Sequence, residues 1–354
     1  MTSRIVVDTG RASTLNSGLG QVVFFFAEAL SEIVPDDMDF TFLVHRKMQP
    51  IFKSSFSFRT IVSVPARRLV PDAFSTGDIW HVLNPDSTSV PLRHPRIVLT
   101  LHDLRILAVK RGITGAAYKN RLQKIVHSSV GLTAISEFTR TGMRENFDIP
   151  PIPFEVIRNG IAAPERADVK PVTQVDAPYL LALGLFEEKK RFHLLVEMMQ
   201  YLPELNLLLV GFNDNAYGRR VKRLASEMGL QRQIHFVGTV DEGRKWQLYA
   251  NCRALVFPSE LEGFGLPVLE AMAMGKPVYI SCDGALPETG GELANYFSVL
   301  KPRDMAGQIR ASIQDDLRPS ARKTSAKKRE DYARTFTWAK AVRRYLSFYR
   351  SILD

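Results

Sequence analysis

The sequence has few cysteines and no long hydrophobic run. Its 354 residues include only Cys252 and Cys282, neither in a CxxC pair nor near a histidine at metal-ligand spacing. A disulfide framework is therefore excluded, and a structural zinc site has no support. No stretch approaches the roughly 18 unbroken apolar residues that span a bilayer. The chain enters a predicted strand at Ile5 without the pattern of a signal peptide, so we expect a cytoplasmic protein.

Positive charge is in excess and unevenly spread. The net charge is +10, and the window from Arg318 to Arg350 holds eleven Lys or Arg against two acids. Together with the basic amphipathic stretch from Lys110 to Lys124, this window could bind an anionic membrane surface at the inner face of the cytoplasmic membrane. A solvated helix surface explains the same charge. No helix-turn-helix, zinc or RNA-binding motif is present, so we expect no nucleic-acid partner.

Short apolar runs alternate with helical patterns along most of the chain, which is typical of βαβ units and a parallel sheet. A polar, proline-containing stretch at 162–178 interrupts this alternation, and the pattern then starts afresh. We therefore predict an α/β protein with two doubly wound, Rossmann-like domains that face each other across a cleft, divided at 165 and 166. Ligands of such sheets bind beyond the carboxyl ends of the strands.

The most informative segment runs from Pro258 to Pro277. An apolar strand ends there, a loop with Gly263 and Gly265 follows, and a helix with proline in its first turn begins at Leu266. Glycines let main-chain N–H groups approach an anion, and the helix dipole favours a phosphate. Glu262 and Glu270 would be repelled by that phosphate, so sugar hydroxyls are their better partners.

Three further patterns follow predicted strands. Gly184 precedes the cations 189–191, which would neutralise the charge on a departing nucleoside diphosphate. Gly18 and Gly20 open a helix after the first strand, but no third glycine completes a dinucleotide-binding fingerprint. His102 and Asp103 close another strand, where a structural hydrogen bond is as plausible as catalysis.

The segment from Glu262 to Glu270 closely resembles the E-x7-E motif of retaining glycosyltransferase family 4, which has the GT-B fold. The likeness extends along nearly the whole chain. Within the family, the sequence resembles bacterial polysaccharide mannosyltransferases. It implies that Glu262 contacts the transferred sugar and that Glu270 binds the donor ribose. It also implies a C-terminal helix, residues 337–354, that crosses back to the first domain. Donor-binding roles fall by position to Gly18, Gly20, Gly184, Lys189, Lys190, Gly263, Phe264, Gly265 and Leu266, and a catalytic role falls to Lys190, Glu262 and His102.

The resemblance implies an enzyme that moves a hexose, with retention, from a nucleotide-diphosphate sugar to a saccharide or lipid-linked glycan. GDP-mannose is the preferred donor, and cell-surface polysaccharide or lipopolysaccharide synthesis is the setting. In that scheme residues 1–165 bind the acceptor and residues 166–336 bind the donor. A nucleotide-sugar epimerase or hydrolase, and a catalytically silent donor-binding subunit, remain the alternatives. No cofactor or metal is expected: the DxD triplet Asp37–Asp39 lies in a short connection before the second strand rather than in a predicted site.

Overall fold

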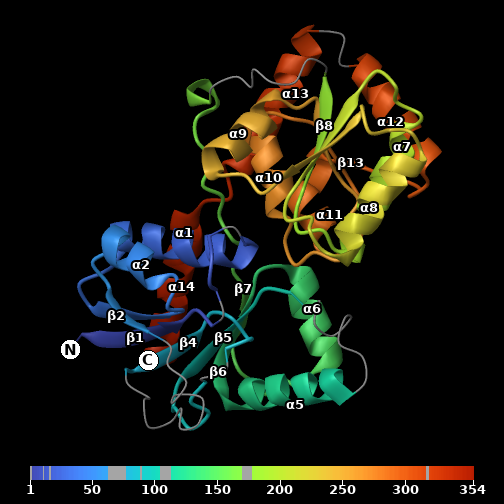
Figure 1. Ribbon diagram of the computed structural model, residues 1–354. Coiled ribbons are helices and arrows are strands. Elements are labelled where there is room, and N and C mark those ends of the chain that lie inside the picture. Colours follow the sequence, from blue (N-terminus) through green and yellow to red (C-terminus); the bar gives the residue numbers. More distant parts are fainter. Residues whose placement is uncertain are drawn as a thin grey trace. The chain divides into compact units, whose positions relative to one another are not determined.

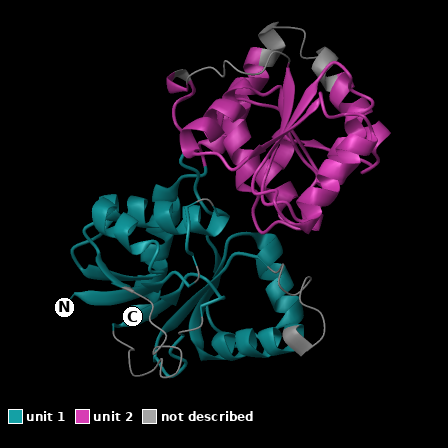
Figure 2. Cartoon of the chain, viewed as in Figure 1, with its two compact units in different colours: residues 1–162, 336–354 teal, residues 163–335 magenta. Residues whose placement is uncertain are grey.

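The computed structural model describes residues 2–354 except 11, 16, 63–76, 88–89, 104–112, 170–177 and 316–318. The chain forms two compact units: residues 1–162 with 336–354, and residues 163–335 (Figure 2). The predicted division at 165 and 166 differs from this one by a few residues. Part of the predicted interdomain stretch, and residues 110–112 of the basic stretch, lie outside the described residues.

Unit 1 is built on a parallel sheet whose described strands run in the order β3-β2-β1-β4-β5-β6-β7 (Figure 1). The sequence of β4 and β5 is apolar almost throughout, and every residue in them is buried, as expected for strands covered on both faces. The strands are β1 (Ser3–Asp8), β2 (Met38–Val44), β3 (Arg59–Val62), β4 (Ile79–Val82), β5 (Ile97–Leu101), β6 (Ser129–Ala134) and β7 (Phe154–Val156).

Helices cover both faces of this sheet (Figure 1). Helix α1 is capped by Ser17, whose hydroxyl accepts a hydrogen bond from the Gly20 N–H. The C-terminal helix lies beside α1, while α5 covers the opposite face. The helices are α1 (Gly18–Ile33), α2 (Gln49–Ser55), α5 (Ile113–Ser128), α6 (Glu137–Asn146) and α14 (Trp338–Leu353).

Helix α14 is joined to the sheet of unit 1 by buried hydrogen bonds. Tyr349 Oη lies 2.7 Å from His81 Nδ1, and His81 Nε2 lies 2.7 Å from Thr100 Oγ1. Burial, and to a smaller extent His102, lowers the pKa of His81 to about 3, so this imidazole stays neutral. The last helix therefore completes the core of the first unit, as the resemblance implied.

Unit 2 has a parallel sheet with the order β10-β9-β8-β11-β12-β13 among its described strands. Figure 1 shows α7, α8 and α12 on one face and α9, α10 and α13 on the other. The strands are β8 (Tyr179–Leu183), β9 (Asn206–Val210), β10 (Ile234–Gly238), β11 (Ala254–Phe257), β12 (Val278–Ile280) and β13 (Asn295–Tyr296). The α-helices are α7 (Phe192–Met199), α8 (Ala216–Glu227), α9 (Glu242–Asn251), α10 (Leu266–Ala273), α11 (Leu286–Gly290), α12 (Pro302–Asp315) and α13 (Pro319–Ala333).

Both sheets reverse their winding direction at an internal strand pair, β1 and β4 in unit 1 and β8 and β11 in unit 2. This is the switch point at which open parallel sheets bind their ligands. The loops that follow β8 and β11 carry the glycines, lysines and glutamates singled out by the sequence. The predicted pair of doubly wound α/β domains is confirmed.

Candidate functional site

The loop after β8 begins with Gly184, which has a left-handed φ of +146°. A Cβ at this position would lie 3.0 Å from Cε of Lys190, so glycine lets the lysine stem pack against the main chain. The Lys190 ammonium lies 4.4 Å from the centre of the Phe257 ring at the end of β11, a cation–π contact. The two loops of the switch point are thus joined by one side chain.

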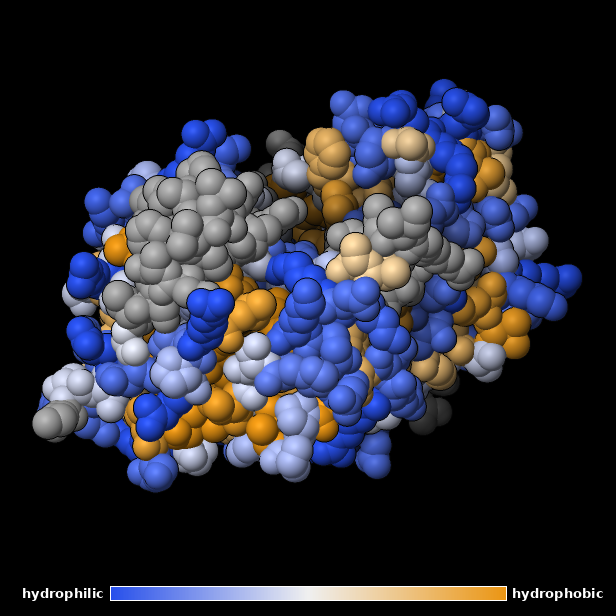
Figure 3. Space-filling model, turned by 90° about the horizontal axis from the view of Figure 1, so that it is seen from below, coloured by the Kyte–Doolittle hydropathy of each residue, from blue (hydrophilic) through white to orange (hydrophobic). Residues whose placement is uncertain are grey.

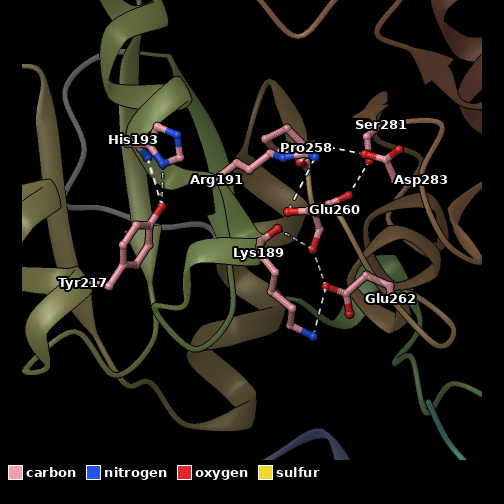
Figure 4. Close-up of polar contacts among 10 residues, drawn as sticks. Lys189, Arg191, His193, Tyr217, Pro258, Glu260, Glu262, Ser281 and Asp283 are labelled. Atoms are coloured by element: carbon pink, nitrogen blue, oxygen red, sulfur yellow. Dashed lines mark hydrogen bonds and ion pairs between the residues drawn. The ribbon is translucent and has the colours of Figure 1, made fainter. Parts of the chain in front are cut away.

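Glu262 receives its partners from both of these loops (Figure 4). Lys190 Nζ donates to Glu262 Oε1 at 2.7 Å, and the Ser259 hydroxyl donates to the same oxygen. Lys189 Nζ lies further away, 3.9 Å from Oε1, and donates to the Leu261 carbonyl. Burial by itself would raise the pKa of Glu262, but the two lysines and the hydrogen bonds from Lys190 and Ser259 outweigh it and lower that pKa. The carboxylate therefore stays charged.

The main chain after Glu262 leads directly into helix α10. Gly265 caps this helix with a φ of +100°, a conformation that strongly favours glycine. Phe264 is buried, and its carbonyl accepts a hydrogen bond from the Thr289 hydroxyl. Gly263 is also buried, and in the first turn of α10 the Val268 N–H donates to the Gly265 carbonyl at 2.9 Å.

Glu270 lies one turn inside α10 and is buried between α10 and α9. Its Oε1 accepts from Lys245 Nζ at 2.8 Å, and its Oε2 accepts from Tyr249 Oη at 2.8 Å. Lys245 also contacts Glu242 Oε2 at 2.9 Å. Burial would lower the pKa of Lys245, but the two glutamates overcome this and raise it. Both members of the E-x7-E pair are therefore ion-paired with lysines.

Arg191 differs from its two neighbours in the basic run. Its backbone is left-handed, with a φ of 51°, and its guanidinium donates to Asp283 Oδ2 at 2.7 Å (Figure 4). It also approaches Glu260 Oε2 at 3.7 Å. Arg191 is thus paired with acids of the neighbouring loops, as Lys190 is with Glu262, and the expectation that three cations would face a departing diphosphate stays a prediction.

The candidate residues of unit 1 lie after β1 and β5. A Cβ at Gly20 would lie 1.8 Å from the Thr14 carbonyl oxygen, so the loop requires glycine there, whereas one at Gly18 would meet no described atom within 4 Å. His102 Nε2 donates to the Leu83 carbonyl at 2.7 Å. Burial lowers the pKa of His102, although this hydrogen bond and Asp103 oppose the shift. The neutral ring keeps Nδ1 as its acceptor.

Sequence reasoning missed Lys245, Tyr249, Ser259 and Asp283, which hold the predicted residues in place. One signal was available in helix α9. Lys245, Leu248, Tyr249 and Cys252 recur at helical spacing along its inward face, and all four are buried. A lysine within an apolar stripe needs a buried acid as its partner.

Two doubly wound units, with a C-terminal helix on the first and a charged, glycine-opened site in the second, define the GT-B class. The solved structures agree in fold. A glycosyltransferase from Rickettsia africae aligns with a TM-score of 0.79 at 17% identity, covering 100% of this chain and 99% of that one. HepE from Anabaena, solved with UDP and glucose, aligns with a TM-score of 0.78 at 16% identity, covering 99% and 100% of the two chains.

Residues 165–331 match the family described as "Glycosyl transferases group 1". "O-antigen chain mannosyltransferase B" of Escherichia coli is 28% identical over 74% of this chain and 72% of the relative. "O-antigen chain mannosyltransferase RfbU" of Salmonella typhimurium is 22% identical over 78% and 82%. The matched family segment lies in unit 2, and the chain as a whole has the GT-B fold of glycosyltransferases and resembles mannosyltransferases of polysaccharide synthesis.

The pKa of Glu262 provides a test of the site's electrostatics. Because the folded-state pKa is depressed, ionised Glu262 stabilises the fold above the pKa of the unfolded chain, and this contribution is lost as pH falls through the folded pKa. Lys190 is the larger of the charges that oppose the effect of burial on Glu262, so Lys190→Met is expected to raise the Glu262 pKa. Carbon-13 NMR titration of the glutamate carboxyls measures it.

Lys189→Met is the matched control, because its ammonium lies 3.9 Å from Glu262 Oε1 rather than the 2.7 Å of Lys190. It should raise the Glu262 pKa less than Lys190→Met does. An equal or larger rise in the Lys189 variant would contradict the assignment of Lys190 as the principal partner.

Proposed function

We propose that this protein transfers a hexose with retention of configuration from a nucleotide-diphosphate sugar to a saccharide or lipid-linked glycan. GDP-mannose is the proposed donor, and synthesis of a cell-surface polysaccharide such as lipopolysaccharide is the proposed setting. The observation that carries this is the largely buried Lys190–Glu262 pair beside the glycine-opened start of α10. The mannosyltransferase relatives support the choice of sugar.

The proposed division of labour follows from charge. Lys189, Lys190 and the N-terminal turn of α10 stabilise the diphosphate as it leaves, because negative charge grows there in the transition state. Glu262, ionised and flanked by the lysines, accepts hydrogen bonds from hydroxyls of the transferred sugar. Glu270 accepts them from the donor ribose. Gly184, Gly263, Phe264, Gly265 and Leu266 line this donor site with main chain.

Unit 1 is proposed to bind the acceptor. Gly18 and Gly20 give a loop whose backbone approaches the donor phosphate, and His102 presents Nδ1 as an acceptor toward a hydroxyl of the donor sugar. No side chain is nominated as a covalent nucleophile. The leaving diphosphate takes the acceptor's proton on the same face from which it departs, so that the enzyme aligns the acceptor and stabilises charge.

Removing either member of the central pair should reduce turnover. Lys190→Ala or Glu262→Ala is expected to lower kcat by roughly 10² to 10⁴-fold, the scale for losing one electrostatic contact at a reacting centre. A screen of GDP, UDP, ADP and dTDP sugars, read by nucleotide release and by product analysis, supplies the assay. Near-normal turnover in both variants would refute the assignment, and full-rate release of free sugar without acceptor would favour a hydrolase.

Catalysis is also proposed to need no metal. Among the described residues no group of three or more His, Cys, Asp or Glu side chains is arranged to hold an ion. Asp37 of the DxD triplet pairs with Arg350 at 3.2 Å. Transfer should therefore proceed at full rate in EDTA. Loss of activity in EDTA that added manganese restores would overturn this proposal.

We propose a cytoplasmic location with peripheral binding to anionic membrane. Within the described residues no helix is long and apolar enough to cross a bilayer. Several cations of the basic window are already paired, including Arg334 with Glu165 and Arg344 with Glu155. Exposed Lys323 and Lys328 on α13 and Arg343 on α14 add positive charge. On the face drawn in Figure 3, hydrophilic and hydrophobic residues are interspersed.

The membrane proposal predicts binding that depends on charge and salt. At low ionic strength the protein should sediment with phosphatidylglycerol vesicles and should be released by about 0.5 M salt, where the Debye length falls to about 4 Å. Phosphatidylcholine vesicles are the control. Failure to sediment with anionic vesicles would remove the support for this proposal.

A further inference from the structure

The carboxylate of Glu270 is fixed at both oxygens by one face of a neighbouring helix. Lys245 and Tyr249 lie four residues apart on α9, so they project from the same side of that helix. The lysine holds Oε1 and the tyrosine holds Oε2, each at 2.8 Å. Tyr249 is wholly buried, and Lys245 and Glu270 each keep about 8% of their surface exposed. The side chain of Glu270 therefore has little freedom to rotate.

The hydroxyl of Tyr249 remains a donor in this setting. Burial, followed by the charge of Glu270 and the hydrogen bond to it, raises the pKa of Tyr249 well above its ordinary range. The phenol accordingly keeps its proton and donates to Oε2, while Lys245 donates to Oε1. The arrangement is an acceptor held by two donors of fixed position.

A structural role alone does not explain the choice of these residues. A buried ion pair between two packed helices is usually no more stabilising than apolar side chains of similar volume, because both charges lose hydration. Stability alone therefore does not account for this glutamate, and its unused acceptor positions are available to a ligand. A carboxylate offers about four lone-pair positions, and Lys245 and Tyr249 occupy one on each oxygen.

We infer that Lys245 and Tyr249 are positioning residues that orient Glu270 to accept hydrogen bonds from the two ribose hydroxyls of the donor nucleotide. This inference rests on the proposed function, in which Glu270 binds that ribose. Neither residue touches the substrate. Each acts by holding the Glu270 carboxylate in one rotamer. The carboxylate is then already oriented before the nucleotide binds, and binding carries no further entropic cost for ordering it.

The test compares nucleotides with and without ribose hydroxyls. Calorimetry measures the affinities of GDP and of UDP, and of the 2′,3′-dideoxy analogue of each. The wild-type protein should prefer its ribonucleotide by about tenfold or more, as expected for hydrogen bonds to a charged group. Tyr249→Phe removes one donor at almost constant volume and should reduce that preference by about fivefold, while affinity for the dideoxy analogue changes little.

Tyr179→Phe is the matched control. The Tyr179 hydroxyl donates to the Leu248 carbonyl of the same helix at 2.9 Å. Its removal perturbs α9 without touching Glu270, so the ribose preference should stay at the wild-type value. Lys245→Met is the second variant and should also reduce the preference. A Tyr249 or Lys245 variant that retains or increases the wild-type preference would overturn the inference.

The outcomes for this inference and for the proposed function are separate. Wild-type protein that binds neither GDP nor UDP, nor any other nucleoside diphosphate, contradicts the proposed function itself. Wild-type protein that prefers the ribonucleotide, and loses that preference in Glu270→Gln but not in Tyr249→Phe or Lys245→Met, contradicts only the positioning role.

Discussion

The site of unit 2 depends on two glutamates that lie where little water reaches them, each beside a lysine. Burial disfavours the charged form of Glu262, and Lys190 with Lys189 and Ser259 reverses that effect. Glu270 Oε1 lies 2.8 Å from Lys245 Nζ. Removing one partner of such a buried pair costs on the order of 3–5 kcal/mol, because the other charge is left without compensation. The loops and helices that carry these partners are therefore held in one arrangement relative to each other.

Each pairing joins segments that are distant in the sequence. Lys190 follows β8 and Glu262 follows β11, so their ion pair holds the two loops of the switch point together. Arg191 extends the connection to the loop after β12 through Asp283. The Ala285 N–H donates to the Glu262 carbonyl at 3.0 Å, which fixes the main chain on the other side. The position of the Glu262 carboxylate is thus set both by its ion pair and by the hydrogen bonds of its main chain.

Glycine at the two loop entrances is the steric counterpart of this charge arrangement. Gly184 lets the stem of Lys190 lie against the main chain, and Gly265 lets the chain turn into α10 with a left-handed φ. A Cβ at Gly184 would press on the Lys190 stem, and one at Gly265 would lie 2.8 Å from Cδ2 of Leu286. The same residues were found from the sequence because glycine at a strand end and proline in a first helical turn are local signals.

The sequence predicted what is local and missed what arises from tertiary contact. Strand alternation gave the two α/β units, and the spacing of Glu262 and Glu270 gave the central carboxylates. The partners Lys245 and Tyr249 lie more than twenty residues before Glu270, and only the packing of α9 on α10 brings them together. The acids beside Lys190 and Arg191 were likewise invisible in the sequence, since a run of cations does not reveal which partner each of them has.

Unit 1 illustrates a long-range dependence of a different kind. Its sheet is formed within the first 156 residues, yet Tyr345, Phe348 and Tyr349 of α14 fill the core on one face. His81 lies wholly buried between β4 and that helix, with each ring nitrogen in a hydrogen bond. A buried imidazole without a partner would cost about 1–3 kcal/mol. The buried imidazole of His81 therefore gains its second partner only when the last helix has returned to the sheet, so folding of unit 1 depends on residues that follow all of unit 2.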